Sequence, residues 1–191
     1  MQVTTIVMFS KIEIRDLLIS VLALSLIFSS FNLQLLPVTA FVVVLVFFSH
    51  EMSHKFLAMH YGLAAEYRMW KWGILFGIVL ALLTGGAIVA PGAVHISHKK
   101  KFAFEVAKVT RNQYGWINFV GPLINIIVGL AMVSLWFFMP LELFTLTARI
   151  SFFLALFNLL PIPPMDGSKI LAWNKKLWVL AFAVSLIGLF L

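Results

Sequence analysis

The sequence predicts an all-α polytopic membrane protein with about five to six transmembrane helices and a re-entrant or short β segment near residues 73–97. Of its 191 residues, 62% are hydrophobic and 11% are charged, a balance far outside that of soluble domains. Long apolar runs alternate with short clusters of lysine and arginine along the chain. We therefore expect a single transmembrane domain, residues 1–191, with no room for a sizeable soluble domain.

The charged residues and the absence of cysteine narrow the classes of partner and site. The formal net charge is +7, but the basic residues lie between apolar runs, as they do in cytoplasmic loops of membrane proteins. We therefore expect the lipid bilayer, and no nucleic acid, as a partner. Without cysteine, disulfides and thiolate metal sites are excluded, so any metal site must use histidine and carboxylate ligands.

The first two expected helices lie in the N-terminal third of the chain. Ser10 and Glu13 have the spacing of a capping box, so a helix is expected to begin there and to continue through the apolar run 17–31. Pro37 suits the first turn of the second helix. That second helix is expected to run to about His60.

The remaining apolar segments are less uniform. Residues 72–91 are interrupted by four glycines and closed by a Pro-Gly pair, so they form either a re-entrant segment or an ordinary short spanning helix. The runs 116–139 and 143–160 are long enough to cross a membrane. A last apolar run, residues 177–191, is shorter, and the chain could be truncated at this end.

A His-Glu-Met-Ser-His motif lies within the second expected helix. His50 and His54 are four residues apart, so their imidazoles lie one above the other and can bind one cation. Glu51 could reach a water molecule on that cation. Two core histidines with hydrogen-bond partners are the simpler interpretation, but ionisable side chains at membrane depth are costly and usually functional. Lys55 is expected to extend its ammonium group to the inner surface.

A catalytic zinc site usually has three protein ligands, so a third ligand must come from elsewhere in the chain. The other acidic residues at apparent membrane depth are Asp166 and Glu142. Asp166 precedes Gly-Ser, a sequence that equally suits a simple helix cap or turn. A carboxylate would complete a set of two histidines and one aspartate.

The topology decides whether Asp166 can reach the histidines. With the N-terminus inside, two crossings bring His54 back toward the inside. Asp166 then ends on the same side only if residues 73–91 re-enter the membrane instead of crossing it. The positive-inside rule also favours re-entry, because a full crossing would place the lysine cluster 99–101 outside.

Three blocks of sequence together resemble the site-2 protease family of intramembrane zinc metalloproteases. They are the His-Glu-x-x-His motif at residues 50–54, Gly-Pro-Leu-Ile-Asn at 121–125, and residues 158–167, which follow the family pattern N-x-x-P-x-x-P-x-D-G. The blocks define an expected catalytic core of about residues 36–170. Ser168 departs from the family, which often has a second glycine at that position.

The resemblance implies a set of functional residues. His50, His54 and Asp166 are the expected ligands of one Zn²⁺ per chain. Glu51 is the expected general base, and Asn158 is expected to stabilise the oxyanion.

We therefore expect an intramembrane zinc metalloendopeptidase of the cell membrane, multi-pass, with its active site toward the cytoplasmic side. Its substrate would be a transmembrane protein, expected to be a single-pass helix, that unwinds and adds as a strand to a sheet edge near residues 85–94. The alternatives are a divalent metal transporter, which has no need of Glu51 as a base, and a zinc-binding membrane scaffold without turnover. The sequence indicates neither the substrate's identity nor the oligomeric state.

Overall fold

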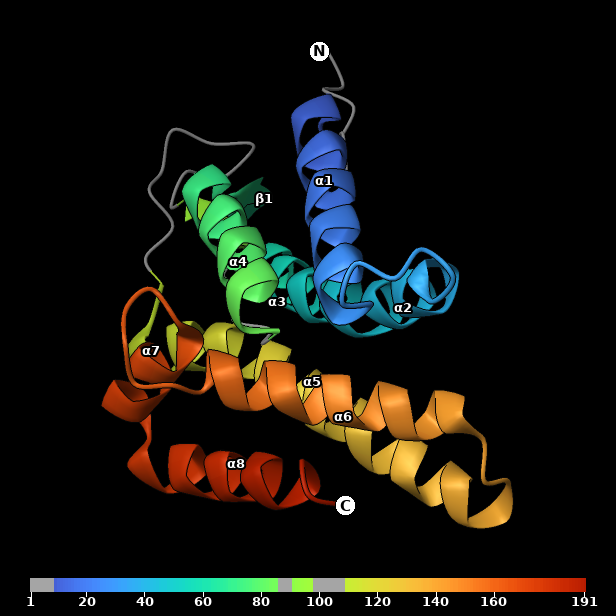
Figure 1. The fold of residues 1–191 in the computed structure, drawn as a ribbon. Helices are drawn as coiled ribbons and strands as arrows, with labels where there is room; N and C mark the ends of the chain where they lie inside the picture. The colour runs from blue at the N-terminus through green and yellow to red at the C-terminus, as the bar shows by residue number, and fades with distance from the viewer. Residues whose placement is uncertain (1–8, 86–90, 98–108) are drawn as a thin grey trace.

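The computed structural model describes residues 9–85, 91–97 and 109–191, and it is mostly helical with one small sheet (Figure 1). The elements in chain order are α1 (Lys11–Phe28), α2 (Leu36–Val43), the π-helical turn η1 (Val44–Phe48), α3 (Ser49–His60), β1 (Ala64–Met69), α4 (Lys71–Thr84), β2 (Gly92–Ser97), α5 (Arg111–Phe138), α6 (Glu142–Asn158), α7 (Asp166–Trp173) and α8 (Lys175–Gly188).

The two N-terminal helices begin and end where local chemistry places them. The Ser10 hydroxyl accepts a hydrogen bond from the backbone N–H of Glu13 and caps α1 where the sequence predicts its start. The Glu13 carboxylate does not complete the predicted capping box, because it binds Lys55 and the backbone of Tyr67 instead. Segments α2, η1 and α3 form one helix, Leu36–His60. Gly62 follows it with a φ of +77°, a conformation that favours glycine. The π-helical turn ends two residues before the His-Glu-x-x-His motif begins, and such turns are frequent at functional sites.

Two helices among the described residues are long and apolar enough to cross a membrane: Leu36–His60, with 25 residues, and α5, with 28 residues. Helices α6 and α8 have 17 and 14 residues, and they are shorter than the roughly 20 residues of an ordinary span. The mostly helical fold is therefore confirmed, whereas the expected number of spans stays a prediction.

The segment that follows β1 leaves the sheet and returns to it. Strands β1 and β2 pair antiparallel, with Met69 opposite Gly92. One residue further on, the backbone N–H of Trp70 donates to the carbonyl of Pro91 over 2.8 Å. Helix α4 therefore starts beside the point where the described chain resumes, as a re-entrant segment requires. Strand β2 confirms a β segment within 73–97, whereas residues 86–90 lie outside the described part of the chain.

Helices α5, α6 and α8 pack together (Figure 1). Small residues allow these helices to approach closely, as is common at contacts between membrane helices. A Cβ atom added to Gly129 of α5 or to Gly188 of α8 would meet the ring of Phe152 on α6. This packing holds the C-terminal end of α6, and with it α7, beside α5.

Candidate metal centre and active site

Three side chains from two distant stretches of the chain meet at one point. The Nε2 atoms of His50 and His54, both on α3, lie 3.0 Å apart. The Oδ2 atom of Asp166, the first residue of α7, lies 3.6 Å from the former and 3.1 Å from the latter. Both histidines are buried, and the Asp166 side chain is 14% exposed. The structure thus brings together the three residues that the sequence predicted as metal ligands.

The spacing of these atoms fits a tetrahedral metal ion. Ligand atoms about 2.0–2.1 Å from a tetrahedral zinc lie about 3.3 Å from one another. The three observed separations, from 3.0 to 3.6 Å, fall around this value. Two imidazole nitrogens and a carboxylate oxygen are also ligand types that zinc binds in proteins. The donor set and its geometry therefore fit a divalent metal.

Helix α5 supplies a hydrogen-bond partner for the Nδ1 atom of each histidine. His54 Nδ1 lies 2.5 Å from the carbonyl oxygen of Ile117, which can only accept, so Nδ1 carries the proton and Nε2 keeps its lone pair. His50 Nδ1 lies 3.1 Å from the side-chain amide of Asn125, whose Oδ1 is buried without a hydrogen-bond partner in the described residues. Turning that amide by 180° lets Oδ1 accept from Nδ1–H, which leaves His50 Nε2 free to bind a metal.

Gly121 allows α5 to approach this close. A Cβ atom at this position would collide with the Nε2 atoms of both His50 and His54. Any side chain here would therefore occupy the space between the ligands and the helix that orients them. The sequence singled out the 121–125 block through its resemblance alone, and it assigned no role to Gly121, to Asn125 or to the Ile117 carbonyl. A backbone carbonyl leaves no signal in a sequence.

Asp166 acts neither as a helix cap nor as a surface acid. The cap position of α7 is Met165, and no side-chain hydrogen bond caps this helix. Burial disfavours the charged form of Asp166, but the imidazoles of His54 and His50 outweigh it and hold its pKa below the ordinary value. The carboxylate is therefore ionised, as a metal ligand must be. Its Oδ1 atom lies 3.4 Å from the ammonium group of Lys169.

The other acid considered as a ligand is remote. Glu142 begins α6, whereas Asn158 ends that helix and lies at the site. At 1.5 Å per residue, the 16 steps between them amount to about 24 Å. Among the described residues, the metal-ligand group contains Asp166 and not Glu142.

The three candidate ligands line a cavity of about 650 Å³, together with Glu51, Asn158 and strand β2. Glu51 is 6% exposed, and its Oε2 has no hydrogen-bond partner among the described residues. Val94 of β2 also lines this cavity. A buried carboxyl group with an uncommitted oxygen thus faces a space large enough for water and a short stretch of extended peptide.

Asn158 lines the same cavity from the C-terminal end of α6. Its amide nitrogen donates one hydrogen bond to the carbonyl of Leu154, over 2.9 Å. An amide nitrogen has two protons, so a second N–H can reach a group inside the cavity. The structure therefore collects all five predicted site residues around one space.

Comparison with known proteins identifies the family. The sequence model of peptidase family M50 matches residues 138–174, which contain Asn158 and Asp166. A protein of Methanocaldococcus jannaschii, provisionally named zinc metalloprotease MJ0611, is 37% identical over 190 residues, or 94% of this chain and 93% of that protein.

A second relative, the provisionally named zinc metalloprotease YwhC of Bacillus subtilis, is 24% identical over 165 residues, which cover 75% of this chain and 72% of that protein. No solved structure gives a significant match. Because the Methanocaldococcus jannaschii relative is 37% identical over nearly the whole length of both proteins, the chain belongs to peptidase family M50, the site-2 proteases.

Proposed function

We propose that this protein is an intramembrane zinc metalloendopeptidase that cleaves transmembrane segments of membrane proteins. The observation that carries the proposal is the meeting of His50, His54 and Asp166 beside the buried carboxyl group of Glu51. Membership of family M50 and the names of the two relatives support a zinc protease. The long apolar helix that carries the motif supports a site within the membrane.

One zinc ion per chain would be held by His50, His54 and Asp166. When bound, zinc supplies Lewis acidity, which lowers the pKa of water from 15.7 to about 7 and polarises a peptide carbonyl. The chain's own contribution is to fix the ligands. The Ile117 carbonyl and the Asn125 amide orient the two imidazoles, and Gly121 leaves room for them.

Two further side chains act on the substrate. Glu51 accepts a proton from the attacking water on its unpaired Oε2 and later delivers it to the nitrogen of the leaving amine. Asn158 donates its second amide proton to the oxygen that gains negative charge as the carbonyl is attacked. Such a donor typically contributes about 10²- to 10³-fold to the rate.

The substrate docks as an added strand on the outer edge of β2. Hydrogen-bonded pairs alternate along an antiparallel ladder, and Trp70 pairs with Pro91. Gly92, Val94 and Ile96 therefore direct their backbone groups away from β1, and all three line the cavity. A transmembrane helix that unwinds there can present its scissile bond in extended form.

The proposal includes a multi-pass topology of about five to six spans in the cell membrane, with a single-pass substrate. Because the chain returns to the sheet at Pro91, α5 and α6 can serve as one outward and one inward crossing. That arrangement agrees with the meeting of Asp166 and His54 on one side. The basic clusters between apolar runs favour the cytoplasmic side for the end of the molecule that contains Asp166 and His54.

The test compares wild type with Glu51→Gln in detergent micelles. The probe is a pool of synthetic peptides, each with one apolar span of about 20 residues, analysed by mass spectrometry. We expect defined cleavage by wild type, a loss of about 10²- to 10⁴-fold in Glu51→Gln, and one zinc per chain in both proteins. Zinc flux in liposomes without any peptide cleavage would instead identify a transporter.

A further inference from the structure

The two edges of the small sheet face different surroundings. The pairing of Trp70 with Pro91 leaves Tyr67 and Met69 with their backbone N–H groups directed away from β2. This outer edge of β1 faces α1, whereas the outer edge of β2 lines the cavity of the metal centre. An unpaired edge accepts any extended chain unless something covers it.

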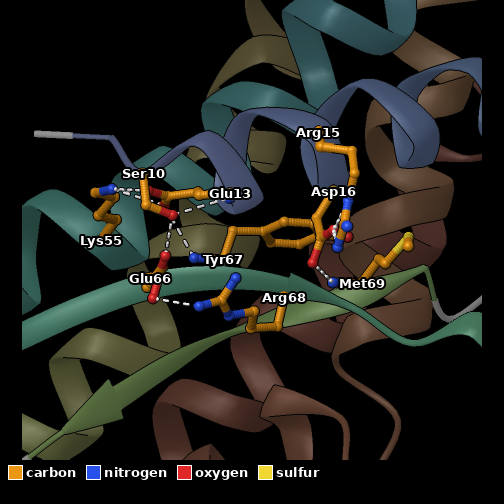
Figure 2. A network of polar contacts seen from close by, with 9 residues as sticks. All are labelled: Ser10, Glu13, Arg15, Asp16, Lys55, Glu66, Tyr67, Arg68 and Met69. Carbon is orange, nitrogen blue, oxygen red and sulfur yellow. Dashed lines mark hydrogen bonds and ion pairs between the residues drawn. The ribbon is translucent and has the colours of Figure 1, made fainter.

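Carboxylates of α1 cover the β1 edge (Figure 2). Glu13 Oε1 accepts from the backbone N–H of Tyr67 over 2.9 Å, and Asp16 Oδ2 accepts from that of Met69 over 3.3 Å. Both acids are buried, at 1% and 4% exposure. The two carboxylates, three residues apart on one face of α1, thus take the places that a third strand's carbonyl groups would take.

The same Glu13 carboxylate binds the zinc-motif helix. Both of its oxygens accept from the ammonium group of Lys55, over 2.5 and 2.6 Å, and Lys55 is 1% exposed. The ring of Phe9 covers this ammonium group at 4.2 Å. The expectation that Lys55 reaches the surface is therefore wrong, because a buried counterion on α1 holds it inside. Lys55 directly follows His54, so Glu13 links β1 to the turn of α3 that carries a metal ligand.

We propose that Glu13 is a positioning residue for substrate docking: shared between Lys55 and the Tyr67 N–H, it holds the sheet at a set distance from the metal centre. With Asp16 it also reserves the β1 edge, so an added substrate strand finds its place at β2 and in one register. This inference rests on the proposed function. Because a shift of one residue along the edge would move the scissile bond by about 3.3 Å, a misplaced sheet changes where cleavage occurs.

Two double variants separate the edge contact from the buried charge. Glu13→Gln with Lys55→Met removes both charges and retains a side-chain oxygen for the Tyr67 N–H. Glu13→Leu with Lys55→Met also removes both charges but leaves no acceptor. Lys11→Gln, an exposed change in the same turn of α1, is the control.

Each protein is assayed for zinc content, for kcat and KM on one cleaved peptide of the pool, for cleavage position, and for hydrogen exchange at the Tyr67 and Met69 amides. We expect the Gln–Met variant to stay within about 3-fold of wild type with one cleavage position. The Leu–Met variant is expected to lose at least about 10-fold in kcat/KM, mainly through KM, to cleave at several positions and to lose Tyr67 protection, with one zinc retained.

Equal KM, cleavage position and exchange in the two double variants would overturn the positioning role and leave the protease intact. Absence of cleavage by wild type would overturn the proposed function and the inference with it. Should the Leu–Met variant not fold, Asp16→Leu against Asp16→Asn repeats the comparison at the Met69 amide. Equal results for that pair would overturn the role of the covered edge.

Discussion

The same turn of α3 contributes to two buried polar clusters of different kinds, one through His54 and one through Lys55. On one side, His54 joins His50 and Asp166, and three atoms with lone pairs face one another. On another side, Lys55 meets Glu13, and the two charges neutralise each other with the sheet edge as a further donor. The first cluster offers three ligand atoms to a cation, whereas the second supplies its own counterion.

The difference indicates which cluster binds a metal and which one stabilises the fold. In a low-dielectric interior, an unmatched polar group is strongly unfavourable, so a cluster that leaves acceptors unmatched is arranged for something that binds. A cluster with matched charges needs nothing from outside and serves to hold elements together. Changes in the first cluster should therefore affect zinc and activity, and changes in the second should affect stability and docking.

The largest effect is expected from Asp166→Asn, which removes the one anionic residue of the proposed ligand set. Loss of a group that hydrogen-bonds to a metal ligand typically lowers metal affinity by about 10- to 100-fold. Loss of the ligand itself should therefore lower the affinity further and abolish cleavage. Zinc content after dialysis against a weak chelator measures the change. Glu142→Gln, an exposed acid of α6, is the control and should retain its zinc. A zinc-replete Asp166→Asn protein would contradict the assignment of this ligand.

Next in size is Lys55→Met, which leaves Glu13 charged and buried without its partner. Breaking a buried pair in this way typically costs about 3–5 kcal/mol in the free energy of unfolding. The addition of Glu13→Gln should recover much of this loss, since no buried charge then remains. Unfolding in mixed micelles measures both, with zinc per folded chain unchanged. A Lys55→Met protein as stable as wild type would show that the pair contributes nothing to stability.

Much of the candidate metal centre could be predicted from motifs in the sequence and from their order along the chain. His50 and His54 follow from a four-residue helical spacing in an apolar run, and Asp166 follows from a crossing count together with the resemblance. The contacts made by α5 could not be predicted. Nothing in the sequence pairs Ile117 with His54 across 63 positions, because the contact uses a backbone oxygen.

In the fold, too, features set by nearby residues could be predicted, whereas contacts between distant residues could not. Helix boundaries such as Ser10 and His60 follow from caps and breakers near them in sequence. The partner of Lys55 lies 42 positions away and depends on where α1 packs. A lysine near a helix end usually extends to the surface, and only the acid on α1 makes burial favourable here.

A smaller effect is expected at Asn125, whose side-chain amide contacts His50 Nδ1. Asn125→Leu removes the side-chain oxygen that can accept from His50 Nδ1–H, so zinc affinity should fall by about 10- to 100-fold. Asn125→Asp keeps an acceptor of the same length and should bind zinc nearly as tightly as wild type. Competition with a chromophoric chelator measures both affinities. Equal affinity in the Leu and Asp variants would show that this contact does not orient the histidine.

The smallest effect is expected at Tyr67, whose backbone N–H donates to Glu13. Its hydroxyl lies 2.8 Å from that of Ser20, so Tyr67→Phe leaves a buried hydroxyl without this partner and should cost about 1–2 kcal/mol at neutral pH. Burial, with the charge of Glu51 as a smaller cause, raises the pKa of Tyr67 above its ordinary value of 10.0. The folded protein therefore keeps the phenol proton at a pH where the unfolded chain loses it.

Because the folded state then binds more protons, the stability of wild type falls as pH rises above about 10, by up to about 1.4 kcal/mol per pH unit for this group. Tyr67→Phe lacks this dependence, so the difference between the two proteins should shrink above pH 10 and stay constant below it. Unfolding at pH 8 to 11 measures the difference, with the exposed Ser134→Ala as a control that should follow wild type. A constant difference across this range would mean that Tyr67 ionises as readily in the folded protein as in the unfolded chain.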